Sequence, residues 1–198
     1  MGNYEYIISS LPVPDKDARS GGVPAEELIA FIRSQLSKKD NALVDLLLRG
    51  HDETTLGEEF YREALADRDR FIREYFRFDL NLRNAKVRYL NKALGRPEGQ
   101  DIFLEPEGVF EEKERVEAVL ALKDILARER GIDDIRWEKI LALTVFNYFD
   151  IDAVLGFIAR MLIIGRWVRL DDRTGREMFR RLVEEVRGTF QGVRFNDK

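Results

Sequence analysis

The sequence contains no cysteine and only one histidine, which excludes several classes of functional site. Without cysteine the chain cannot form a disulfide scaffold or a thiolate metal centre. A di-metal carboxylate bundle needs two Glu-x-x-His pairs, but the single histidine, His51, has Leu48 three residues before it. Because no second histidine or cysteine accompanies it, we interpret His51 as a solvated loop residue just past a helix.

Phosphate-binding and nucleophile motifs are also missing, since neither G-x-x-x-x-G-K-[ST], G-x-G-x-x-G nor G-x-S-x-G occurs. Pairs of aspartates are the remaining candidates for a carboxylate site: Asp133 with Asp134, Asp150 with Asp152, and Asp171 with Asp172. Helix capping or turn formation explains each pair where it stands. We therefore expect no catalytic residue, no cofactor and no metal, and a protein that is not an enzyme. An enzyme with a carboxylate site near Asp150, Asp152, Asp171 and Asp172 is kept as an alternative.

Neither a strong positive charge nor a long apolar run is present. The 33 basic and 37 acidic residues give a net charge of −4, which argues against a protein whose main work is to neutralise nucleic-acid phosphates. Charged residues interrupt the apolar segments, so no run approaches the roughly 18 residues that would indicate a membrane span. The first ten residues lack the basic and apolar regions of a secretory signal. We expect a cytoplasmic protein.

What the sequence does contain is apolar residues at helical spacing. Hydrophobic residues make up 44% of the chain and charged residues 35%, which is typical of a helical protein with a solvated surface. Apolar positions recur three and four residues apart, and no βαβ alternation is visible. This pattern predicts an all-α fold, an irregular bundle of about seven to eight helices.

Capping residues and helix breakers suggest where these helices begin and end. Residues 3–14 could be a strand or a helix, because their periodicity does not decide between them. The next helices are expected from Pro24 to Leu36, from a cap at Asp40 to a left-handed Gly50, and from Thr54 or Thr55 to Gly95 with a break near Asp79. After the glycine-rich segment, helices are expected from Glu111 to a stop at Gly131, from a cap at Asp133 or Asp134 through Trp137, and from a cap at Asp150 or Asp152 to Trp167. A last helix is expected around Met178, Phe179, Leu182, Val183 and Val186.

Residues 137–167 hold the densest set of large apolar side chains and predict two packed helices. The face of the second helix that we expect to be buried consists of Val154, Leu155, Ile158, Leu162 and Ile163. Residues 95–108 contain three glycines and two prolines and are the best candidate for a linker. We therefore expect either two helical lobes, residues 1–95 and 96–198, or a single domain.

One segment interleaves basic and aromatic residues. Within residues 71–92, the cations that could meet an acidic surface are Arg73, Arg77, Arg83, Lys86 and Arg88. Many of them have acidic neighbours and the whole chain is acidic, so a solvated helix face or a protein contact is favoured. A helical nucleic-acid-binding module is kept as an alternative. Near the end of the apolar stretch, Arg166 and Trp167 are of the types that anchor protein interfaces.

Three stretches together resemble a known family. Residues 3–12 (NYEYIISSLP), 78–95 (FDLNLRNAKVRYLNKALG) and 148–179, which include Arg166-Trp167 followed by an aspartate and a glycine, resemble an uncharacterised bacterial family encoded among genes for V-type ATPase subunits. That family is similar in turn to the C (eukaryotic d) subunit of V/A-type ATPases. This relative is an all-helical, lobed socket that links the rotor axle to the membrane ring, and we call it the socket subunit.

The closest local similarity to the socket subunit lies within residues 79–88, where Asp79, Asn84, Lys86 and Arg88 approximate its pattern and Ala85 replaces a leucine. Because this chain is shorter than the socket subunit, the resemblance implies a version with one or two lobes. It implies a non-catalytic component that binds the central stalk subunits and the rotor ring in proton or sodium transport, and that meets the inner membrane only through the ATPase. The partner-binding residues that we expect are Arg73, Arg77, Asp79, Arg83, Asn84, Lys86, Arg88, Arg166 and Trp167.

Overall fold

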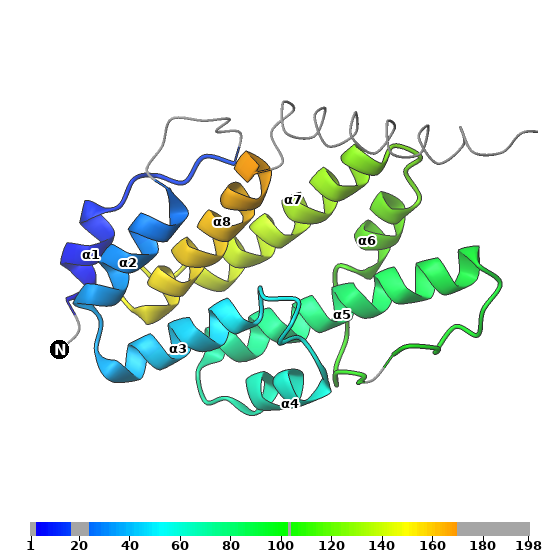
Figure 1. The fold of residues 1–198 in the computed structure, drawn as a ribbon, viewed down its shortest axis with the longest axis horizontal. Helices are drawn as coiled ribbons and strands as arrows, with labels where there is room; N and C mark the ends of the chain where they lie inside the picture. Colours follow the sequence, from blue (N-terminus) through cyan, green and yellow to red (C-terminus); the bar gives the residue numbers. More distant parts are fainter. Residues whose placement is uncertain (1–2, 17–23, 103, 170–198) are drawn as a thin grey trace, which may run out of the picture.

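A computed structural model describes residues 3–16, 24–102 and 104–169, and in these residues it contains eight helices and no strand (Figure 1). The helices are α1 (Tyr4–Ser10), α2 (Ala25–Gln35), α3 (Lys38–Arg49), α4 (Glu58–Ala66), α5 (Arg70–Ala93), α6 (Lys113–Leu120), α7 (Ile125–Thr144) and α8 (Ile151–Arg169). The predicted all-α class is therefore confirmed. The last helix expected from the sequence, around Met178, lies outside the described residues.

Helices α7 and α8 lie side by side, as the apolar density of residues 137–167 predicts (Figure 1). Gly156 of α8 sits where the two helices meet, because a Cβ atom there would lie 2.6 Å from Cγ2 of Thr144 on α7. Asp150 caps α8 by accepting a hydrogen bond from the amide of Ala153 at 3.0 Å, which confirms one of the two predicted caps. The other candidate, Asp152, instead accepts from the guanidinium of Arg70 at 2.8 Å.

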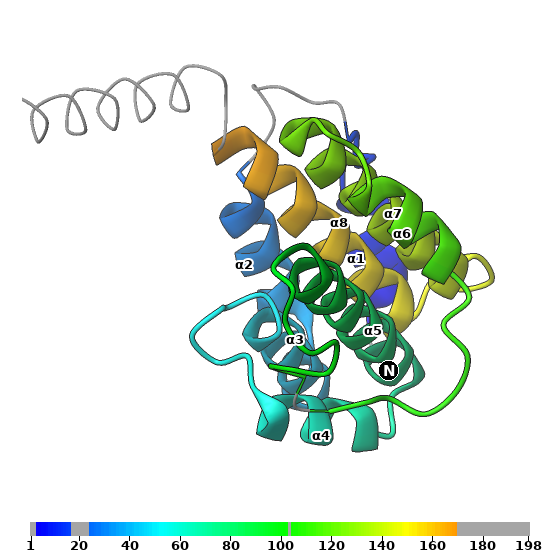
Figure 2. The same ribbon diagram turned by 90° about the vertical axis from the view of Figure 1, so that its right-hand side faces the viewer.

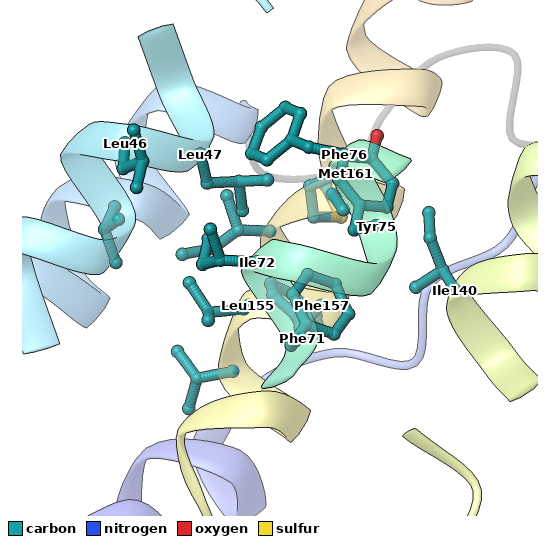
Figure 3. Close-up of a cluster of buried hydrophobic side chains, with 14 of the residues drawn as sticks. Leu46, Leu47, Phe71, Ile72, Tyr75, Phe76, Ile140, Leu155, Phe157 and Met161 are labelled. Atoms are coloured by element: carbon teal, nitrogen blue, oxygen red, sulfur yellow. The ribbon is translucent and has the colours of Figure 1, made fainter. Parts of the chain in front are cut away.

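The larger core surrounds α8, which packs against α1, α2, α3, α5 and α7. Figure 3 shows side chains of α3, α5, α7 and α8 that meet in it. Of the predicted apolar face of α8, all are buried except Leu162, which is partly buried. Aromatic rings of α4 and α5 add edge-to-face contacts, with the centroids of Phe60 and Phe76 4.9 Å apart.

A smaller core forms where α5, α6 and α7 meet, and its buried members are Phe78, Leu82, Val116, Leu120, Ile132 and Ile135. The long helix α5 contributes to both cores, with α3 and α4 on one side and α6 and α7 on the other (Figure 2). The larger core includes helices from both sides of residue 95. The division into lobes at that residue stays a prediction.

Two predicted helix breaks are wrong. Helix α5 runs unbroken through Asp79, and the break lies earlier, where Asp69 caps α5 by accepting from the amide of Ile72 at 3.0 Å. Neither Thr54 nor Thr55 opens a helix, because α4 begins after Gly57. Residues 111–131 do not form one helix, because α6 ends at Leu120 and α7 begins after Asp124. The predicted stop at Gly131 and the predicted cap at Asp133 or Asp134 therefore both lie inside α7.

The N-terminal helices also differ in detail from the prediction. Residues 4–10 are helical, which resolves the ambiguity of the opening segment. Helix α3 is capped by Ser37, whose hydroxyl accepts from the amide of Asp40 at 3.2 Å, so the cap predicted at Asp40 is one turn too late. Gly50 ends α3 as expected, but with φ −67° it is not in the left-handed conformation that we predicted. Within the residues described, no helix has the length and hydropathy of a membrane-spanning segment.

Candidate functional site

A buried ionic network joins four helices around Asp133 of α7. Asp133 is 5% exposed, and its carboxylate accepts hydrogen bonds from three donors. These are Nη1 of Arg136 at 3.2 Å, Nη2 of Arg166 at 2.7 Å and Nε1 of Trp167 at 2.8 Å. Because charge-assisted hydrogen bonds in a desolvated position are strong, this carboxylate ties the end of α8 to the middle of α7.

The same network reaches α4 and α5 through Asp79. Its carboxylate accepts from the hydroxyl of Tyr61 at 2.6 Å and from Nη2 of Arg136 at 3.2 Å, and Nε of Arg83 lies 3.6 Å away. Burial on its own would raise the pKa of Asp79, but the charge of Arg136, the Tyr61 hydrogen bond and the charge of Arg83 together outweigh burial and lower it. Asp79 is therefore a buried, ionised centre. We call Asp79 and Asp133 with their donors the Asp133 network.

The hydrogen bonds of the Asp133 network join side chains of four helices to one another. Each carboxylate oxygen of Asp79 and Asp133 already accepts at least one hydrogen bond from within the chain. Among the residues that the structure describes, no three acidic or histidine side chains gather where they could hold a metal ion. What the arrangement can do is fix the relative positions of α4, α5, α7 and α8.

Arg166 and Trp167, both expected to bind a partner, lie inside this network. Besides Asp133, Arg166 pairs with Glu129 of α7 at 3.2 Å. The indole ring of Trp167 lies 3.7 Å from the guanidinium carbon of Arg130 and 5.2 Å from that of Arg166. Their present contacts thus join α7 to α8, and a role in partner binding stays a prediction.

The candidate residues of α5 do not form one surface. Lys86 joins the network through Glu129 at 3.8 Å, whereas Asn84 is buried and donates to the carbonyl of Leu104 at 2.9 Å. Arg88 pairs with Glu105. The remaining two lie nearer the start of the helix, where Arg77 pairs with Glu74 at 2.8 Å and Arg73 donates to the carbonyl of Asp67 at 3.1 Å. For nucleic-acid binding, these cations would have to exchange partners within the chain for phosphates.

The described residues of the carboxylate alternative have partners within the chain. Asp150 is a helix cap, and Asp152 forms an ion pair with Arg70. Asp134, the neighbour of Asp133, pairs with Lys16 at 2.7 Å on the surface. The other pair, Asp171 and Asp172, lies outside the described residues.

Among the described residues, large exposed apolar side chains gather at the end of α7 and in its connection to α8, which sequence reasoning placed within a core segment. Its five large side chains are between 42% and 86% exposed: Leu141, Val145, Phe146, Tyr148 and Phe149. We call these five residues the aromatic turn. Leu141 and Val145 are four residues apart and continue one outward face of α7 into the connection. The sequence signal was the placement of three aromatic residues next to the predicted cap at Asp150.

Arg70, the first residue of α5, anchors the aromatic turn. Its Nη2 atom donates to the carbonyl of Leu143 at 2.7 Å, to Oδ1 of Asn147 at 3.1 Å and to Oδ2 of Asp152 at 2.8 Å. The amide of Asn147 also contacts the carboxylate of Asp150. Because one guanidinium contacts a carbonyl before the turn and side chains within and after it, the turn presents its aromatic side chains from an anchored base.

His51 is exposed just past α3, as predicted, and its ring also contacts the aromatic core. Its Nε2 atom lies 3.0 Å from the hydroxyl of buried Tyr75, and the two rings are stacked. Desolvation lowers the pKa of His51, and the charge of Arg136 acts in the same direction, while the charges of Asp79 and Asp133 oppose it. Since the residue as a whole is exposed, solvent limits the size of this shift.

We predict that the pKa of His51 lies below the value of about 6.5 of a free histidine. A lowered pKa means that the folded state loses stability as the pH falls from the unfolded value toward the folded one, because the unfolded chain binds the proton more tightly. An NMR titration can follow the one histidine of the chain without assignment. Tyr75→Phe is the matched variant and should move the titration, whereas a midpoint at or above 6.5 would contradict this assignment.

One comparison with known protein families found a match to part of the chain. Residues 103–189 match a family model described as a protein of unknown function, DUF2764, a segment that includes α6, α7 and α8. This part of the chain is thus similar to an uncharacterised family, which agrees with the coarser part of the sequence resemblance. The comparison does not link this domain to the socket subunit of a V-type ATPase. No match was found among curated proteins or among solved structures.

Proposed function

We propose that this protein is a non-catalytic helical subunit that binds other proteins through the aromatic turn. The observation that carries the proposal is the gathering of five large, exposed apolar side chains on one anchored connection. Exposed apolar clusters of this kind mark interaction surfaces, because leaving them in water is unfavourable. Aromatic side chains are also the types that most often dominate binding energy at interfaces.

The identity of the partner in this proposal comes from the resemblance of residues 3–12, 78–95 and 148–179 to proteins encoded with V-type ATPases. On that basis the chain is a bacterial V-type ATPase component of the socket type, which binds central stalk subunits and the rotor ring in proton or sodium transport. The buried Asp133 network supports a mechanical role, since charged contacts across four helices oppose their relative displacement.

A double substitution of the aromatic turn, Phe146→Ser with Phe149→Ser, tests the proposal. We expect binding to co-expressed central stalk subunits to weaken by roughly a hundredfold, which corresponds to about 2.7 kcal/mol for two interface anchors. The melting temperature should stay unchanged, because both side chains are already exposed. The measurements are co-purification and titration calorimetry at low and moderate salt.

Val109→Ser is the matched control, because Val109 is 88% exposed on the segment before α6. It should leave binding unaltered. If the unaltered chain does not co-purify with the stalk subunits, the ATPase assignment is wrong. If it does co-purify and the double variant binds equally well, the aromatic turn is not the interface.

A further inference from the structure

We propose a second docking surface at the other end of α7, which accepts an acidic, apolar segment of a different protein. Its apolar part consists of Leu122, Ile125 and Leu126, which are 41%, 72% and 59% exposed. Its cationic part consists of Lys123 and Arg130. We call these five residues the α6–α7 surface. The inference rests on the proposed function of a linking subunit, because a protein that links two others needs two separate surfaces.

The two surfaces are separated by the length of one helix. The aromatic turn lies at the last turn of α7 and in the connection after it, and the α6–α7 surface lies at its first residues (Figure 1). With 20 residues, α7 spans about 30 Å at 1.5 Å per residue. At that separation two partners can bind at the two ends of α7 at the same time without a steric clash.

The charge of the α6–α7 surface indicates what kind of segment it accepts. Within the described part of the chain, Lys123, Arg128 and Arg130 form no ion pair with a carboxylate. The nearby carboxylates are already engaged, since Asp124 accepts from two backbone amides as the cap of α7 and Glu129 pairs with cations of α5 and α8. Among the described residues, this end of the molecule therefore presents cations without an ion-pair partner next to exposed apolar side chains.

Two of these cations are held in place by aromatic rings. The guanidinium carbon of Arg130 lies 3.7 Å from the ring of Trp167, and that of Arg128 lies 5.3 Å from the ring of Tyr89. Arg128 also donates to the carbonyl of Leu122 at 2.7 Å. A guanidinium that is fixed in this way loses little entropy when it forms paired hydrogen bonds with a carboxylate.

The chain's own last residues are a poorer match for this surface than an acidic partner. Residues 170–198 contain seven basic and six acidic side chains, so they offer no net negative charge. An occupant with aspartate or glutamate beside leucine-like residues satisfies both the cations and the aliphatic side chains. We therefore assign the surface to a second protein, different from the one bound by the aromatic turn.

The test uses the full chain co-expressed with the central stalk and rotor ring subunits. Lys123→Glu and Ile125→Ser should each weaken binding of one partner subunit by about tenfold or more, because rim charges and apolar contacts both contribute. Neither variant should affect the partner that is lost from the Phe146 and Phe149 variant. The matched controls are Lys39→Glu on α3 and Val109→Ser before α6, at exposed positions outside this surface, which should bind like the unaltered chain.

A photo-crosslinking amino acid at position 125 identifies the occupant. Crosslinks to an acid-rich segment of a partner, together with rescue of Lys123→Glu by a glutamate-to-lysine change in that segment, support the proposal. Crosslinks to residues 170–198, to a second copy, or binding only to phosphatidylserine vesicles overturn it. If the unaltered chain binds the stalk through the aromatic turn but Lys123→Glu and Ile125→Ser bind both partners normally, this inference fails and the proposed function stands. If the chain binds no ATPase subunit, the proposed function fails, and a crosslink to an acid-rich segment of another protein still supports the surface.

Discussion

Asp133→Asn is expected to lower the free energy of unfolding by about 3 kcal/mol, because it removes the negative charge that compensates buried cations. Asparagine keeps one acceptor oxygen, but its amide group turns hydrogen-bond donors toward Arg136, Arg166 or Trp167, which are donors themselves. For a chain of this length the loss corresponds to a fall in melting temperature of roughly 10 °C. Thermal and urea unfolding measure it.

Asp134→Asn is the matched control at the next position. Asp134 is half exposed and its one ion pair, with Lys16, lies at the surface, so the expected cost is below about 1 kcal/mol. Asp133→Asn combined with Arg166→Gln should cost less than the sum of the single changes, because the cation left uncompensated is then removed as well. Equal melting temperatures for Asp133→Asn and Asp134→Asn would mean that the network does not stabilise the fold.

Gly50→Ala is expected to destabilise the protein by about 3 kcal/mol through overpacking. A Cβ atom at Gly50 would lie 2.1 Å from Cε1 of Phe76 and 2.9 Å from Cζ of Phe60. Both rings are buried in the larger core, so neither can move aside without disturbing its neighbours. The backbone of Gly50, with φ −67°, suits alanine, so the whole effect comes from packing. Urea unfolding of the variant measures it.

Phe76→Leu provides the rescue that identifies the cause. The shorter side chain leaves a small cavity by itself, but it makes room for the new methyl group, so the double variant should be more stable than Gly50→Ala alone. Gly99→Ala is the matched control, because no atom lies within 4 Å of a Cβ atom there. If Gly50→Ala unfolds at the same urea concentration as Gly99→Ala, the close approach of Phe76 is not a constraint on this fold.

For Gly50 the sequence predicted the right helix end but the wrong physical cause. The sequence predicts that Gly50 ends α3, and the structure confirms this. Glycine is required there because Phe76 occupies the space of a Cβ atom, not because the backbone is left-handed. Gly131 was expected to stop a helix and instead lies inside α7, where a Cβ atom would be 2.8 Å from Val119 of α6. In both cases the constraint comes from a neighbouring helix, which local propensities do not describe.

For the candidate sites too, the sequence singled out some of the residues but not the contacts between them. The sequence drew attention to Arg166 and Trp167 from their residue types, but it interpreted Asp133 as a helix cap in preference to a carboxylate site. The structure joins all three, and it links Asp79 to Arg136 across 57 residues of sequence. Such a separation cannot be inferred from one sequence, because the pairing depends on how α5 and α7 pack.

The amino-acid sequence by itself determined the helical class, the paired helices of residues 137–167 and the lack of thiolate and histidine-rich chemistry. These follow from composition and from the 3.6-residue period, both of which are local properties. Only the tertiary structure decided where burial departs from that pattern. It buried the ionisable Asp79 and Asp133 and exposed Phe146 and Phe149, because burial depends on which helices pack together and where they end.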